Sequence, residues 1–108
     1  MKIGEYYQQG DVRIERVEKI PDGEIVQPDN RGYVLAEGEV SGHCHKIDAV
    51  KNMTMIKTAD GTLYMRVTKT VPLKHDEHFI HIIEPGEYKV GKILERDHFT
   101  RITREVTD

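Results

Sequence analysis

The stretch MTMIKTADGTLYMRV, residues 53–67, decides the fold, because two apolar-rich segments flank Asp60-Gly61, a strong signal for a two-residue hairpin turn. A turn at these residues predicts a core face made of three cross-strand pairs: Thr58 with Leu63, Ile56 with Met65, and Thr54 with Val67. The opposite face is then expected to carry Met53, Met55, Tyr64 and Arg66. Its apolar strip, Met53/Met55/Tyr64, predicts contact with a second copy of the chain and hence a homodimer.

The rest of the chain shows short alternating or apolar segments separated by turn residues, and little helical periodicity. Strands are predicted over residues 11–20, from 33 onward, and over 79–83, 88–94 and 98–106, with a loop at 21–32 that holds a short extended piece at Ile25-Val26. Pro72 is expected to end a strand and to leave residues 73–77 in a loop. The best helical candidate is a short turn near residues 46–52. The sequence therefore predicts an all-β single domain, 1–108, built as a small barrel or sandwich of about seven to eight short, mainly antiparallel strands.

Composition excludes some classes of function. The 108 residues carry a formal net charge of −3 with acids and bases interspersed, so a nucleic-acid partner is not expected. No segment is long and apolar enough to span a membrane, and the N-terminal residues lack the apolar run of a signal peptide. A single cysteine, Cys44, permits no internal disulfide, and a cytoplasmic location is expected.

Two histidine clusters carry the chemistry. His43 and His45 are one residue apart, so on a strand they share one face while Cys44 points to the other. The second cluster is His75-Asp76-Glu77-His78. We expect the fold to bring both clusters together around a divalent transition metal (Zn, Fe, Ni or Mn), since neutral imidazole binds all of these and a carboxylate often completes the set. His43, His45, His75 and His78 are the predicted ligands, and Glu77 is the predicted further ligand or catalytic base. The alternative is that these are ordinary polar strand residues.

Two further histidines are assigned structural positions. His81 lies inside the apolar run 79–83, where a hydrogen-bonded core histidine is expected in preference to a ligand. His98 follows a charged segment and is expected at the surface.

The segment Gly38 to His45 resembles the first motif of cupins, a glycine followed by a His-x-His pair, and Pro85-Gly86 loosely resembles the turn of their second motif. Cupins are small double-stranded β-barrels that hold a metal, so the resemblance implies that His43 and His45 are ligands and that a third comes from His75 or His78. The chain departs from that family because no Glu follows His45 at the family spacing. The pattern Leu73-x-His75-x-x-His78 is also similar to that of small uncharacterised bacterial and phage proteins.

Three classes of function stay open at this point. A metal-binding barrel with an open coordination position is suited to enzymatic work on a small molecule. A metal-free enzyme would use paired histidines as acid and base on a phosphodiester or sugar, with Lys74 as the anion partner. A non-enzymatic interaction protein would use an exposed strand edge or the Met53/Met55/Tyr64 strip.

Overall fold

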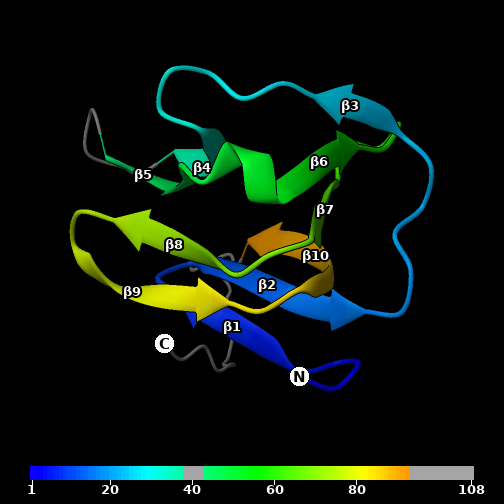
Figure 1. Ribbon diagram of the computed structural model, residues 1–108, viewed down its shortest axis with the longest axis horizontal. Helices are drawn as coiled ribbons and strands as arrows, with labels where there is room; N and C mark the ends of the chain where they lie inside the picture. The colour runs from blue at the N-terminus through cyan, green and yellow to red at the C-terminus, as the bar shows by residue number, and fades with distance from the viewer. Residues whose placement is uncertain (38–42, 93–108) are drawn as a thin grey trace, which may run out of the picture.

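The computed structural model describes residues 1–37 and 43–92, and within these ranges the chain forms ten strands and one short 3-10 helix (Figure 1). The strands are β1 (Tyr6–Gln9), β2 (Val12–Val17), β3 (Glu24–Val26), β4 (Tyr33–Glu37), β5 (Cys44–Ile47), β6 (Met53–Lys57), β7 (Leu63–Val67), β8 (Val71–His75), β9 (His78–Ile83) and β10 (Gly86–Lys92). The predicted all-β class is confirmed, with more and shorter strands than expected. The predicted helical turn is η1 (Val50–Asn52), and the predicted extended piece at Ile25-Val26 is part of β3.

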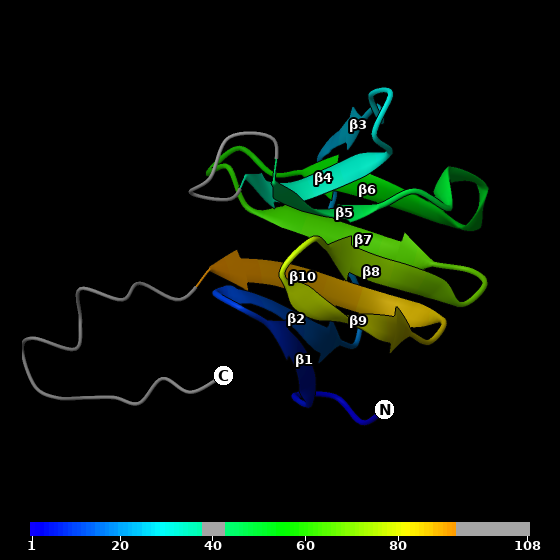
Figure 2. The same ribbon diagram turned by 90° about the vertical axis from the view of Figure 1, so that its left-hand side faces the viewer.

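The strands form two antiparallel sheets that face each other (Figure 2). One has the order β1-β2-β10-β7-β6-β3 and the other the order β4-β5-β8-β9. Among the described residues no strand ladder joins the two sheets into a closed barrel. Apolar side chains from both sheets fill the space between them: Val12, Ile14, Met55, Met65 and Tyr88 from the larger sheet, and Leu35, Ile47, Leu73 and Ile83 from the smaller one.

The central hairpin differs from its predicted register by one residue. β6 and β7 pair Met53 with Val67 and Met55 with Met65, and the loop between them spans residues 58–62. The loop is longer than two residues because Asp60 Oδ1 accepts hydrogen bonds from the Thr58 hydroxyl (2.6 Å) and the Thr62 amide (3.1 Å). A shift of one residue exchanges the two faces of a strand. Met53 and Met55 are therefore buried in the core, and the predicted apolar strip at the surface is wrong.

Pro72 does not end a strand. β7 ends at Val67, and Pro72 lies within β8, opposite Ile82 of β9. β8 pairs with β5 only at Lys46 and Lys74, beyond the proline, so the missing N–H of Pro72 removes no hydrogen bond to β5. The predicted loop at residues 73–77 is accordingly wrong for residues 73–75, which belong to β8, and only residues 76–77 form a turn. His75 thus lies at the end of a strand.

β9 is an edge strand and not the buried strand predicted for residues 79–83. Phe79 is 91 % exposed and Ile80 and Ile82 are also exposed, whereas Ile83 is buried. His81 is half-buried against the ring of Tyr7, with ring centroids 6.2 Å apart, so the prediction of a core histidine is wrong. The pairing explains the pattern: a register shift between Leu73 and His75 places an extra residue in β9 and turns Phe79 outward.

Some expectations concern other parts of the chain. The predicted strand over residues 98–106 and the predicted surface position of His98 lie outside the described residues. In the described part of the chain, no helix has the length and apolar character needed to cross a membrane.

Candidate metal centre

Three histidines from three strands meet at one end of the smaller sheet. They are His45 of β5, His75 of β8 and His78 of β9, called here the histidine triad. Their candidate ligand atoms all lie within 4.8 Å of one another. Ring centroids are 4.4 Å apart for His45 and His75 and 4.6 Å for His75 and His78. The prediction that the two clusters come together is therefore confirmed for these three side chains.

Strand pairing explains the meeting. β5 and β8 are antiparallel and pair Lys46 with Lys74, and continuing that register sets His45 opposite His75. β8 and β9 then pair His75 with His78 across a turn of two residues, Asp76 and Glu77. Side chains directly opposite each other in such ladders lie on the same face, with Cβ atoms about 5 Å apart. Two successive cross-strand pairs thus place three imidazoles side by side.

Gln9, the last residue of β1, supports the triad from the other sheet. Its side chain is 1 % exposed, and its Nε2 donates hydrogen bonds to the carbonyl oxygens of Leu73 and Phe79, both at 2.9 Å. Its Oε1 lies 2.8 Å from His45 Nδ1. Gln9 therefore joins the edge of the larger sheet to β8 and β9 and fixes the orientation of the His45 ring.

The turn between β1 and β2 completes this end of the molecule. Gly10 has φ +58°, and a Cβ at this position would lie 2.7 Å from His78 Nε2, so the glycine makes room for the ring. Asp11 Oδ1 lies 3.4 Å from His45 Nε2, and its Oδ2 lies 3.7 Å from Lys92 Nζ. The sequence predicts only a turn at residues 9–11. These residues precede the nearest triad histidine by more than 30 residues, so no local pattern indicates that they belong to the same site.

His43 and Glu77 lie beside the triad. His43 Nε2 is 3.5 Å from Asp76 Oδ2, and its Nδ1 is 3.6 Å from Glu77 Oε2. The His43 ring centroid is 6.0 Å from that of His75, and His43 does not belong to the group of converging ligand atoms. The structure thus places His43, predicted as a ligand, with the carboxylates of the β8–β9 turn.

Burial keeps the inner histidines neutral. His45 is 2 % exposed, and burial, helped by the neighbouring His75, lowers its pKa from 6.5 to about 4 despite the opposing effect of Asp11. Burial and the proximity of His78 also lower the pKa of His75. At neutral pH both rings therefore have a free nitrogen lone pair, which metal ligation requires.

The hydrogen bonds assign that lone pair differently in the two rings. The Glu77 amide donates to His75 Nδ1 at 3.0 Å, so the neutral His75 ring carries its hydrogen on Nε2. A metal bound through His75 requires either a turn of this ring or loss of the Glu77 hydrogen bond. In His45 Nδ1 is the nitrogen bonded to Gln9, and Nε2 lies 3.4 Å from Asp11 Oδ1.

A family model described as a domain of unknown function (DUF8820) matches residues 8–93, about four fifths of the chain. The chain belongs to this family. The matched segment includes the triad, Gln9 and Asp11. No curated protein and no solved structure matches the chain. The resemblance to cupins stays a prediction.

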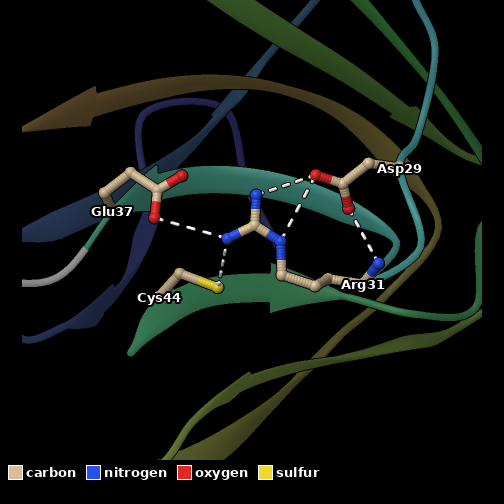
Figure 3. Close-up of polar contacts among 4 residues, drawn as sticks. All are labelled: Asp29, Arg31, Glu37 and Cys44. Carbon is tan, nitrogen blue, oxygen red and sulfur yellow. Dashed lines mark hydrogen bonds and ion pairs between the residues drawn. The ribbon is translucent and has the colours of Figure 1, made fainter. Parts of the chain in front are cut away.

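Two other candidate residues of this family member lie apart from the triad. Cys44 is buried, and its Sγ is 3.9 Å from Arg31 Nη1 (Figure 3). Arg31 is held by Asp29 at 2.8 Å and by Glu37 at 3.4 Å, so Cys44 lies beside an ion-pair cluster formed by the loop before β4 and the last residue of β4. Lys74, predicted as the partner of an anionic substrate, forms an ion pair instead: its Nζ lies 3.0 Å from Asp48 Oδ2.

Proposed function

We propose that this protein binds a divalent transition metal (Zn, Fe, Ni or Mn) through His45, His75 and His78. The convergence of their ligand atoms within 4.8 Å carries the proposal. Metal–nitrogen bonds are about 2.0–2.1 Å long, so two nitrogens on one ion lie roughly 3–4 Å apart. Side-chain movements of about 1 Å, together with a turn of the His75 ring or loss of its hydrogen bond from the Glu77 amide, would close the site around an ion.

The triad suits a site with an open position. His45 and His75 are buried and His78 is exposed, so an ion held by all three lies at the rim of the protein, reachable by water or a small molecule. Three protein ligands and one exchangeable position are the pattern of catalytic metal sites. Enzymatic activity on a small molecule is part of the proposal, with Glu77 as general base, because its carboxylate faces His43 and its amide contacts His75.

Metal analysis of the protein purified without a histidine tag tests the proposal. We expect one equivalent of metal in the wild type and none in His45→Asn, because asparagine keeps a hydrogen-bond donor toward Gln9 but has no counterpart of Nε2. His81→Asn is the matched control: it removes a histidine of β9 outside the triad and should retain the metal. If metal-free wild-type protein binds neither Zn²⁺ nor Co²⁺ on titration, the proposal is wrong.

A second candidate function, self-association, is favoured by the outward side of β9. Phe79, Ile80 and Ile82 expose apolar surface on an edge strand, and such strands pair readily with other strands. A second copy of the chain is the proposed partner, since two β9 edges related by a two-fold axis would bury the same residues on both sides.

Sedimentation velocity tests this interface. The wild type should sediment as a dimer, and Phe79→Asp as a monomer. Ile25→Asp is the control, because Ile25 is also an exposed apolar residue but lies on β3, at the far edge of the larger sheet. A monomeric wild type at high concentration would count against the interface.

A further inference from the structure

The hydrogen bonds of Gln9 define which nitrogen of His45 is free. Both donations from Nε2 go to carbonyl oxygens, of Leu73 and Phe79, so the orientation of the amide is fixed and Oε1 must be the atom that faces His45. A carbonyl oxygen only accepts, so His45 Nδ1 donates across the 2.8 Å contact. In a neutral imidazole the other nitrogen, Nε2, then carries a lone pair and no hydrogen.

That lone pair faces a second electron-pair donor. Asp11 Oδ1 lies 3.4 Å from His45 Nε2, and an ionised carboxylate has no hydrogen to offer. Two acceptors at this distance repel each other unless a cation lies between or beside them. Lys92 does not fill this role, because its ammonium nitrogen contacts the other oxygen, Oδ2, at 3.7 Å and its side chain is largely exposed.

We propose that Asp11 is a ligand of the metal ion together with the triad, and that Gln9 is the positioning residue that directs His45 Nε2 toward it. The inference rests on the proposed metal site and adds a carboxylate from the opposite sheet. Asp11 reaches the triad through His45 and lies outside the group of atoms that already converge, so its side chain must turn toward the ion on binding. Hydrogen bonding of a ligand histidine through its second nitrogen is typical of metal centres and fixes the tautomer. Histidines with one carboxylate suit Zn²⁺, Fe²⁺ or Mn²⁺ and disfavour Cu⁺.

Cobalt titration of the full chain tests Asp11. Co²⁺ reports its ligands through its visible absorption, so loss of a carboxylate changes both affinity and spectrum. Asp11→Asn is expected to bind Co²⁺ about 10- to 100-fold more weakly, with an altered spectrum. Asp48→Asn is the matched control: Asp48 also pairs with a lysine, Lys74, whereas Asp11 contacts the triad residue His45. It should behave like the wild type.

Lys92→Met is expected to change the affinity for Co²⁺ in the opposite direction to Asp11→Asn. It frees Asp11 from its ion pair, so Co²⁺ should bind more tightly if Asp11 is a ligand. Wild-type affinity and spectrum in Asp11→Asn overturn the role of Asp11 while leaving the triad intact. Failure of the wild type to bind Co²⁺ overturns the proposed function itself, and the inference with it.

The role of Gln9 has a separate readout that needs no metal. Long-range ¹H–¹⁵N NMR spectra of the metal-free protein at neutral pH distinguish the two imidazole nitrogens of each histidine. We expect His45 to carry its hydrogen on Nδ1 and to leave Nε2 unprotonated. A hydrogen on Nε2 would mean that His45 donates to Asp11 as a structural pair, and the inference would be wrong.

Discussion

His45 is the residue at which the two sheets, the triad and the β1–β2 turn meet. Its ring lies opposite His75, is held by Gln9 at one nitrogen and is approached by Asp11 at the other. Its low exposure makes the charged form costly, so the folded protein binds a proton on His45 less readily than the unfolded chain does.

The metal-free protein should lose stability as the pH falls from about 6.5 to about 4, the two pKa values of His45 in the unfolded and folded chain. In this range the unfolded chain binds a proton on His45 and the folded chain does not, so the free energy of unfolding decreases with falling pH. The pKa difference sets an upper limit of about 3 kcal/mol for this contribution. Urea unfolding at a series of pH values measures it.

His45→Asn is the control for this pH dependence, because it keeps the donor toward Gln9 and cannot titrate. The pH profile of the variant should be flatter than that of the wild type between about pH 4 and 6.5. An unchanged slope would assign the pH dependence to other groups, with His75, whose pKa is also lowered, as the first to examine.

At the scale of elements, the β1–β2 hairpin matters to the site through its turn. Gln9 pairs with Val12, so Gly10 and Asp11 form a two-residue turn that reaches the triad from the larger sheet. Gly10 has a positive φ and lies against the His78 ring, whereas Gly61, in the β6–β7 loop, has φ +88° and no heavy atom within 4 Å of the place that a Cβ would take. Both glycines therefore need a positive φ, but only Gly10 lies against a neighbouring side chain.

Gly10→Ala and Gly61→Ala should both lower the free energy of unfolding by about 1 kcal/mol, the cost of a side chain at positive φ. Only Gly10→Ala should also weaken Co²⁺ binding, by about 10-fold, because the added methyl displaces the His78 ring. Chemical denaturation and cobalt titration of both variants measure the two effects. Equal cobalt affinities would show that His78 is not held at this position by Gly10.

At the scale of the whole molecule, the site bridges two sheets that no strand ladder joins within the described residues. Figure 1 shows the β8–β9 turn and the start of β5 on the same side of the molecule. Gln9 links β1 directly to β8 and β9 through its hydrogen bonds to Leu73 and Phe79. Its side chain is fully buried. A metal ion bound by the triad would add a cross-link between β5, β8 and β9.

Metal should therefore raise thermal stability. Binding to the folded state alone adds about 2.7 kcal/mol at a free metal concentration 100 times the Kd, which for a domain of this size corresponds to a rise in Tm of roughly 10 °C. Differential scanning fluorimetry with and without Zn²⁺ measures the shift. His45→Asn should show no shift, and His81→Asn should show the wild-type shift; a shift retained in His45→Asn would indicate binding elsewhere.

Alternation and turn residues were enough to predict the all-β class, the short strand at Ile25-Val26 and the turn near residues 46–52. They did not predict the register of the central hairpin, because the side chain of Asp60 hydrogen bonds to Thr58 and Thr62 and stabilises a five-residue loop in place of the two-residue turn. They also misplaced Pro72, since a proline is tolerated in a strand wherever the neighbouring strand is absent, and that depends on sheet order.

The sequence by itself singled out the candidate ligands, because the local spacing of His43, His45, His75 and His78 follows from strand alternation and one tight turn. Only the tertiary structure decided which of them converge. Pairing of β5 with β8 set His45 opposite His75, while His43, at the very start of that segment, fell beside Asp76 and Glu77. Gln9 and Asp11 entered the site through the packing of one sheet on the other. Such a contact depends on sheet order and twist, which no local pattern in residues 9–11 encodes.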